Sequence, residues 1–182
     1  MQRSSVVGAL WALYQHSLAT KPLPTKAATS GLLAGMGDAT AQLAIEKKEL
    51  LDRKRLAIFT ALGGVLVAPA LHTWYATLIH RIPGGAALQV AKRVLCDQLL
   101  FAPLMLPTFM GTMLVLEGKP DPLAEIERAY WPALVTNWKI WTPASTINFG
   151  LVPPHLQVLF ANGVSFIWNS YLSYVTHASK QP

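Results

Sequence analysis

Polar side chains inside long apolar stretches are the residues of this sequence that could do chemistry. A charge at the centre of a bilayer costs about 2.5 to 3.5 kcal/mol, so such groups must face protein or water. Asp38 and Gln42 are four residues apart and would share one face of a helix. We therefore expect a polar path between helices, with seven candidates for its wall: Asp38, Gln42, Asp97, Gln98, Asn137, Lys139 and Asn148.

Each of these candidates also has a structural interpretation. Arg93 and Asp97 are spaced i to i+4, so Asp97 could close a local ion pair instead of lining a path. Lys139 could extend its amine to the membrane surface. Asp38 has no basic residue within one helical turn, so its alternative is a buried group that forms hydrogen bonds between helices.

Motifs of catalysis and of metal binding are absent from the sequence. It has no GxSxG or HExxH motif, and Gly118-Lys119 lacks the upstream glycine of a phosphate-binding loop. The single cysteine, Cys96, excludes a disulfide within the chain or a multi-thiolate zinc site. No two histidines are spaced to chelate from one helix: His16, His72, His80, His155 and His177. We expect no enzyme, no metal and no cofactor.

The elements that would position the polar residues are apolar helices. The chain is 52% hydrophobic and 13% charged, with a mean hydropathy of +0.35, whereas ordinary globular chains carry roughly 25% charged residues. A spanning helix needs about 20 apolar residues. Residues 56–80 contain no Asp, Glu, Lys or Arg, 94–116 contain only Asp97, and 156–176 contain none; 27–45 and 130–152 are weaker candidates.

These stretches predict an all-α, polytopic transmembrane bundle with four or five spans in a single domain over residues 1–182. Before the first span, an amphipathic helix is indicated by apolar residues at helical spacing: Val6, Val7, Leu10, Trp11, Tyr14 and Leu18. Lys and Arg are shared almost equally between alternate connecting segments, so they do not fix the orientation in the membrane. Their dispersion also argues against nucleic acid as a partner.

Small and aromatic residues indicate how the helices pack and where the membrane surface lies. Gly31 and Gly35 form a GxxxG pair, and Gly63-Gly64 lies in the next span. These glycines would pack either against another helix of the same chain or against a second copy, which leaves a homo-oligomer open. We expect interfacial anchors at six positions: His72, Trp74, Tyr75, Trp138, Trp141 and Trp168.

Many spaced polar, aromatic and proline residues form a recognisable pattern over nearly the whole chain. In the first half they are Trp11, Tyr14, Pro22, Thr25, Gly37-Asp38, Gln42, Pro69, His72 and Trp74-Tyr75. In the second half they are Lys92-Arg93, Asp97-Gln98, Phe101-Ala102-Pro103, Trp131-Pro132, Asn137-Trp138, Trp141, Asn148-Phe149, Val152-Pro153, Trp168-Asn169 and Tyr171-Leu172-Ser173. In this pattern the sequence resembles the Mpv17/PMP22 family of organellar membrane proteins. It departs from the family pattern at Ala68, Thr142, Ser145 and Gln157.

The resemblance implies a helical bundle in the mitochondrial inner membrane or, as the alternative, in the peroxisomal membrane. It also implies a weakly selective channel for small solutes or metabolites that supports mitochondrial homeostasis. The alternative is a non-conducting structural or regulatory membrane protein, whose embedded polar groups only tie helices together. The expected partners are the lipid bilayer, small solutes and a second copy of the chain.

Overall fold

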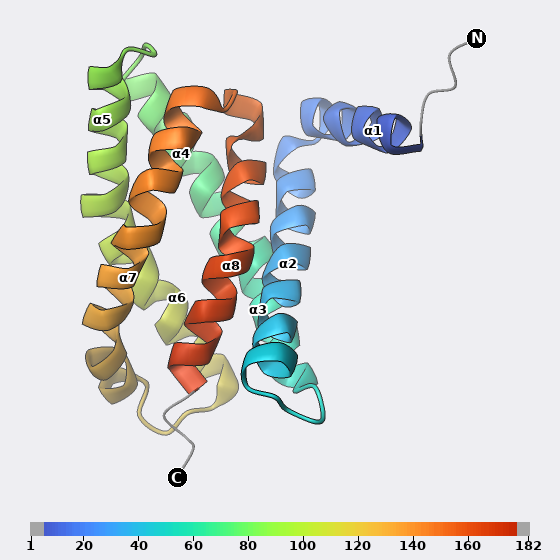
Figure 1. Ribbon diagram of the computed structural model, residues 1–182, viewed down its shortest axis with the longest axis vertical. Coiled ribbons are helices and arrows are strands. Elements are labelled where there is room, and N and C mark those ends of the chain that lie inside the picture. Colours follow the sequence, from blue (N-terminus) through green and yellow to red (C-terminus); the bar gives the residue numbers. More distant parts are fainter. Residues whose placement is uncertain (1–5, 178–182) are drawn as a thin grey trace.

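The computed structural model describes residues 6–177 of the chain, with side chains described up to residue 170, and this part consists of helices and short connecting segments, without a strand (Figure 1). The elements are α1 (Val6–Thr20), α2 (Pro22–Thr40), η1 (Ala41–Ile45), α3 (Arg53–Leu62), η2 (Gly63–Val67), α4 (Ala68–Arg81), α5 (Ala87–Cys96), η3 (Asp97–Phe101), α6 (Ala102–Glu117), α7 (Pro122–Leu151), η4 (Pro154–Leu156) and α8 (Gln157–His177). The π-helical turn η1 continues α2 to its end, and η2 and η3 are π-helical turns inside longer helices, so these elements make six continuous helices, with the short 3-10 helix η4 directly before α8.

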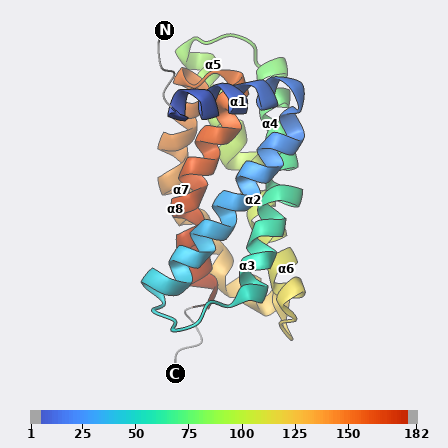
Figure 2. The same ribbon diagram turned by 90° about the vertical axis from the view of Figure 1, so that its right-hand side faces the viewer.

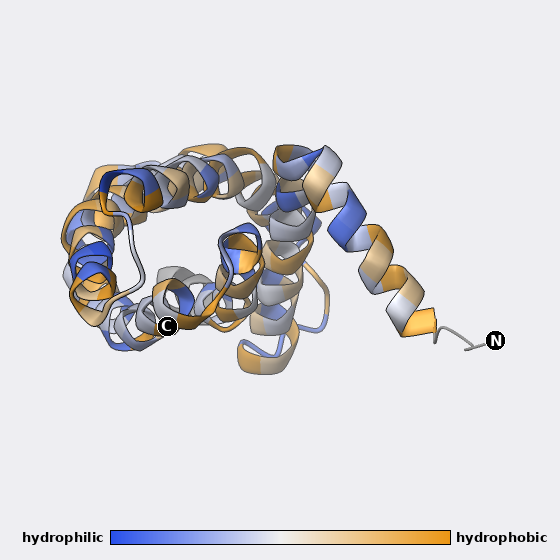
Figure 3. Cartoon of the chain, turned by 90° about the horizontal axis from the view of Figure 1, so that it is seen from above, coloured by the Kyte–Doolittle hydropathy of each residue, from blue (hydrophilic) through white to orange (hydrophobic). Residues whose placement is uncertain are grey.

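Five long helices stand side by side around a common interior, and α1 crosses them at one end (Figures 1 and 2). α2 packs against α3, η2 and α8, and α7 packs against α5, α6 and α8. α3 also contacts α6, so the helices close into a ring. Seen along the bundle axis, the long helices surround this interior and α1 points away from it (Figure 3).

The ends of the helices follow from local sequence signals. Asp52 caps α3 by accepting a hydrogen bond from the backbone N–H of Arg55 at 3.0 Å, and Asp121 caps α7 through the backbone N–H of Ala124 at 3.1 Å. Such caps satisfy backbone donors that have no partner inside the helix. α6 ends at Gly118, whose φ of +79° is a conformation that glycine adopts without strain.

Two of the π-helical turns lie directly before an Ala-Pro pair. η2 precedes Ala68-Pro69, and η3 precedes Ala102-Pro103. Proline has no backbone N–H and its ring crowds the preceding turn, so a wider turn accommodates it without breaking the helix. In η3 this turn also places two consecutive polar side chains, Asp97 and Gln98, in the interior.

The helical bundle expected from the sequence is confirmed, and the number of spans stays a prediction. Two continuous helices, Arg53–Arg81 with 29 residues and Ala87–Glu117 with 31, are long and apolar enough to cross a membrane by length and composition. Large apolar side chains are exposed on their outer faces, as at Leu99 and Leu100, which are more than half exposed. The amphipathic segment forms α1, but only Leu18 of its apolar residues is buried.

Glycines hold α2 close to the second long helix. A Cβ atom added at Gly63 would lie 2.6 Å from Cβ of Ala34 and 2.7 Å from the backbone oxygen of Ser30. A Cβ added at Gly31 would lie 2.9 Å from the backbone oxygen of Thr60. The small residues of the sequence therefore make a contact within one chain, where two backbones approach each other.

We expect Gly63→Val to destabilise the bundle by roughly 1 to 3 kcal/mol, because the added carbons meet backbone atoms that cannot move independently. The measurement is thermal unfolding in detergent. Gly163→Ala is the matched control, since nothing lies within 4 Å of a Cβ at this position of α8. Equal melting temperatures for Gly63→Val and the unmodified protein would contradict the contact.

Candidate functional site

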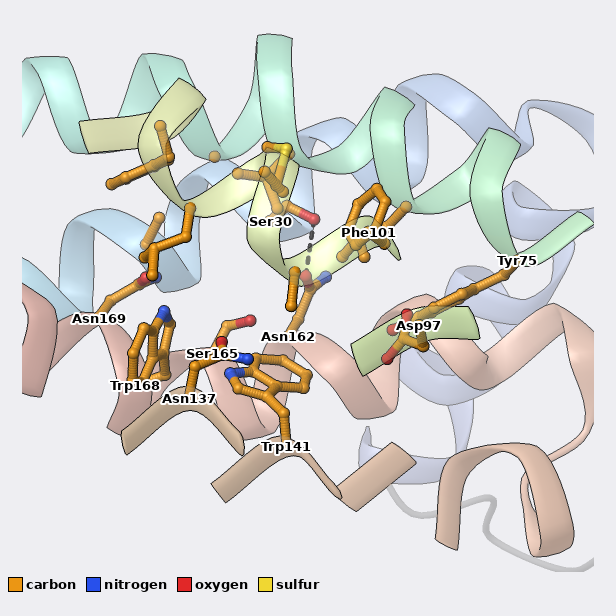
Figure 4. Close-up of a pocket in the computed structure, with 18 of the residues that line it drawn as sticks. Ser30, Tyr75, Asp97, Phe101, Asn137, Trp141, Asn162, Ser165, Trp168 and Asn169 are labelled. Atoms are coloured by element: carbon orange, nitrogen blue, oxygen red, sulfur yellow. Dashed lines mark hydrogen bonds between the residues drawn. The ribbon is translucent and has the colours of Figure 1, made fainter. Parts of the chain in front are cut away.

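A partly open cavity of about 100 Å³ lies between the long helices, and it is the candidate site (Figure 4). Its wall is partly apolar, with Phe101, Phe109, Trp141 and Trp168 among the lining side chains. Its polar wall comes from α2, η3, α7 and α8 and consists of Ser30, Asp97, Gln98, Asn137, Asn162, Ser165 and Asn169. The space is large enough for several water molecules.

Asp97 is the one ionisable carboxylate on this wall. Its Oδ1 accepts a hydrogen bond from Nε1 of Trp74 at 2.9 Å. Its Oδ2 accepts from Oγ of Ser145 at 2.7 Å and from Nε2 of Gln98 at 2.8 Å. All three donors are neutral, and no basic side chain pairs with Asp97 among the ion pairs of the described residues.

Gln98 extends this hydrogen-bond network from η3 to α7. Its Oε1 accepts from Nδ2 of Asn137 at 3.4 Å, and its backbone oxygen accepts from Nε1 of Trp138 at 2.8 Å. Its Nε2 also lies 3.4 Å from Oγ of Ser145. Asp97 and Gln98 are consecutive and both buried in η3, and the hydrogen bond between their side chains joins them in one network.

The opposite wall joins α2 to α8. Oγ of Ser30 donates to Oδ1 of Asn162 at 2.7 Å, and both residues are buried. Nδ2 of Asn162 has no hydrogen-bond partner among the described residues, so it is a donor available to a molecule in the cavity. Ser165 and Asn169 follow on the same face of α8 at positions i+3 and i+7 from Asn162, and they line the cavity too.

Asp38 and Gln42 lie outside this cavity, in a buried ion-pair cluster at one end of the bundle. Arg55 donates to Asp38 at 2.7 Å and to Glu46 at 2.6 Å. Gln42 donates to Asp38 at 2.8 Å and accepts from the backbone N–H of Asp52 at 2.6 Å. Asp38 does have a basic partner, because the fold brings Arg55 to it from seventeen positions along the chain.

Burial raises the pKa of Glu46, but the hydrogen bonds and positive charge of Arg55, together with Lys48, outweigh this effect. The net result is a pKa of Glu46 below its ordinary value. Glu46 lies in the segment between η1 and α3, at the end of the bundle. The cluster therefore ties this segment to the two adjoining helices.

The remaining polar candidates are placed differently. Lys139 is exposed on the outer face of α7, and Asn148 is buried but does not line the cavity. Arg93 does not pair with Asp97: its guanidinium donates to the backbone oxygens of Ile82 and Gly84, both at 2.7 Å. Of the seven candidates, three line the cavity: Asp97, Gln98 and Asn137.

The six residues expected as anchors at the membrane surface are buried or half-buried in the bundle. Tyr75 and Trp168 are buried, and Trp141 lines the cavity. Trp74 and Trp138 donate their indole N–H groups to η3, as described above. His72 accepts a hydrogen bond at Nδ1 from Nζ of Lys26 at 3.0 Å. The polar groups of His72, Trp74 and Trp138 thus have partners inside the protein, and the anchoring role of the six residues at a membrane surface stays a prediction.

Sequence reasoning missed the wall contributed by α2 and α8 and the partner of Asp38. Asn162, Ser165 and Asn169 carry a signal that could have found them, because their spacing places three polar side chains on one face of an apolar helix. Ser30 and Ser145 carry no such signal. Arg55 lies in a charged segment whose pairing depends on the fold.

Comparison with known proteins connects this architecture to a family. The Mpv17 / PMP22 family model matches residues 114–173. The chain is 37% identical to the mitochondrial inner membrane protein Mpv17 of Homo sapiens over 173 residues, 93% of this chain and 98% of that protein. It is 38% identical over 169 residues to the protein SYM1 of Gibberella zeae, covering 89% of this chain and 94% of that protein. No solved structure matches the chain.

A peroxisomal relative is similar to the same extent. The peroxisomal membrane protein 2 of Bos taurus is 38% identical over 169 residues, covering 88% of this chain and 86% of that protein. The names of these relatives bear out the expected localisation, a mitochondrial inner membrane with the peroxisomal membrane as the alternative.

We expect Arg55→Gln to destabilise the protein by roughly 3 to 5 kcal/mol, because it leaves Asp38 charged and buried without its cation. Thermal unfolding in detergent measures the effect. Arg128→Gln is the control: it removes an exposed pair with Glu125 and should cost less than about 1 kcal/mol. Similar losses in the two variants would refute the role given to the buried cluster.

The depressed pKa of Glu46 predicts an acid-sensitive contribution to stability. A group whose pKa is lowered on folding stabilises the protein above its unfolded value, here 4.5, and loses that contribution as the pH falls through its folded pKa. The stability difference between the unmodified protein and Glu46→Gln should therefore be largest near neutral pH and shrink below pH 4.5. A difference that stays constant from neutral pH into this acid range would exclude the linkage.

Proposed function

Because this chain belongs to the Mpv17/PMP22 family of membrane proteins of mitochondria and peroxisomes, we propose that it forms a weakly selective pore for small solutes. The solutes pass through the interior of the ring of helices, along the wall that contains Asp97 and the amides of Gln98, Asn137 and Asn162. In this proposal four or five of the long helices span the bilayer, and no reaction is catalysed.

The observation that carries the proposal is the position of Asp97. It lies ten residues after the start of a continuous helix of 31 residues, about 15 Å from its end at 1.5 Å per residue. Its partners are neutral, so when ionised it has a charge that no basic side chain balances. A charge at this depth is costly unless it faces water, which supports an aqueous interior.

The rest of the wall supports passage rather than tight binding. Amide and hydroxyl groups offer both donors and acceptors to a hydrated solute, and they favour no particular chemical class. The fixed charge of Asp97 would attract small cations more than anions, which gives a weak cation preference. The cavity requires one chain only, so a homo-oligomer would add pores without being needed to form one.

A second candidate is a non-conducting structural protein, and the completeness of the Asp97 network favours it. Each oxygen of Asp97 is already hydrogen-bonded, and the partners come from α4, η3 and α7. Such a network would hold three helices together even if no solute passed. The two candidates differ in what a conservative change at Asp97 does.

We expect Asp97→Asn to reduce the cation preference of single-channel currents in planar bilayers, because the amide keeps the shape of the carboxylate but removes its charge. The reversal potential under a salt gradient measures this preference. Glu125→Gln, which removes a carboxylate from an exposed pair, is the matched control and should leave the reversal potential unchanged.

Two results would contradict the pore. Currents with an unchanged reversal potential in Asp97→Asn would show that the wall is assigned wrongly. A complete absence of currents from folded, reconstituted protein, with a lowered melting temperature of Asp97→Asn, would favour the structural protein instead.

A further inference from the structure

The two ends of the bundle differ sharply in charge. We call the end that carries α1 the α1 end: it comprises α1, the start of α2, the last turn of α4, the segment 82–86, the first two turns of α5, and the segment 152–156 between α7 and α8 (Figure 1). The opposite end comprises the segments 46–52 and 118–121 and the adjoining helix ends. Figure 2 shows from a second side that these two groups of segments lie at opposite ends of the bundle.

The described part of the α1 end has basic residues and no acidic ones. Its Lys and Arg residues are Lys21, Lys26, Arg81, Lys92 and Arg93. The five ion pairs found among the described residues all lie at the opposite end, where Asp and Glu are concentrated. The α1 end is therefore an electropositive surface whose charges are not neutralised by the protein.

Two of these basic residues are buried and still lack a carboxylate. Nζ of Lys26 has one hydrogen bond, to Nδ1 of His72 at 3.0 Å, and Lys26 is 7% exposed. Arg93 donates to backbone oxygens. The other three, Lys21, Arg81 and Lys92, are exposed. Lysine and arginine in this situation attract anionic groups from outside the protein.

The same end carries an unusual amount of exposed apolar surface. α1 lies across the bundle axis (Figures 1 and 2). Five of its side chains are between 47% and 77% exposed: Val6, Val7, Leu10, Trp11 and Leu13. A helix with such residues, lying across a transmembrane bundle, is suited to the boundary between lipid headgroups and acyl chains.

A groove between α1 and α2 combines both properties. Leu10 and Leu13 contribute apolar surface, and Lys21 and His16 contribute basic groups. Hydroxyl groups of Ser17, Thr20 and Thr25 also line it. The hydroxyl groups donate to backbone oxygens of α1 and Lys21, so Lys21 is the donor for a phosphate oxygen while an acyl chain lies on the apolar part.

We infer that the α1 end binds anionic phospholipids of the adjacent leaflet, with α1 in the headgroup region and the phosphates held near Lys21, Arg81 and Lys92. The observation that decides for a lipid over a free anion is the apolar surface beside the charges. The groove is also open rather than enclosed, which suits a ligand that arrives from the bilayer. This inference concerns a different surface from the cavity and does not depend on conduction.

The test is a titration of fluorescent phosphatidylglycerol into the full-length protein in a nonionic detergent, with fluorescent phosphatidylcholine in a parallel titration. The variant Lys21→Gln/Arg81→Gln/Lys92→Gln should bind phosphatidylglycerol more weakly, by about fivefold for each basic residue removed. The control Lys47→Gln/Arg53→Gln/Lys54→Gln removes three exposed basic residues from the opposite end and should change the affinity by less than about twofold.

A conservative variant separates loss of charge from loss of fold. Lys21→Arg/Arg81→Lys/Lys92→Arg keeps all three charges and should retain the affinity of the unmodified protein. Three results would overturn the inference: equal loss in the two triple-glutamine variants, equal affinity for phosphatidylcholine and phosphatidylglycerol, or displacement of the labelled lipid by inorganic phosphate alone. The last result would assign the site to a free anion.

Discussion

The interior of a bilayer offers no water to a polar group, and this constraint explains where the polar residues of the bundle lie. Backbone groups are satisfied within helices. Side chains are satisfied by one another, as when Ser30 donates to Asn162 between α2 and α8 and Trp74 donates to Asp97. The outer surface is left to residues such as Leu99 and Leu104, which are more than half exposed. Polar residues thus determine how the helices are rotated, while glycines determine how closely they approach.

The two embedded aspartates show how differently the fold can treat one residue type. Asp38 is fully buried beside Arg55, so its charge is balanced and its contribution is structural. Asp97 has three neutral donors and faces a cavity. The difference between the two residues therefore comes from the groups that surround each carboxylate and not from the carboxylate itself.

Much of the fold was predictable because apolar length and helical spacing are local properties. The long helices and α1 follow from them, and so does the inward orientation of Asp97, Gln98 and Asn137. Partners that are distant in sequence were not predictable. No sequence feature near Asp38 predicts its pairing with Arg55, and none near Ser30 predicts its hydrogen bond to Asn162, which lies 132 positions away. The internal partners of Trp74 and Trp138 were not predictable for a related reason, since an indole N–H suits a membrane surface and a buried acceptor equally well.

The π-helical turns change which residues of a long helix face the interior. Such a turn contains one residue more than an α-helical turn, so the residues after it are out of phase with those before it. In the helix 87–117 the phase changes at η3, and Val94 before it and Leu106 after it both belong to buried clusters. Deletion of a single residue from η3 would rotate α6 by about 100° about the helix axis relative to α5, so that different side chains would face the interior. Length variation within these helices is therefore far less tolerable than substitution on their lipid-facing sides.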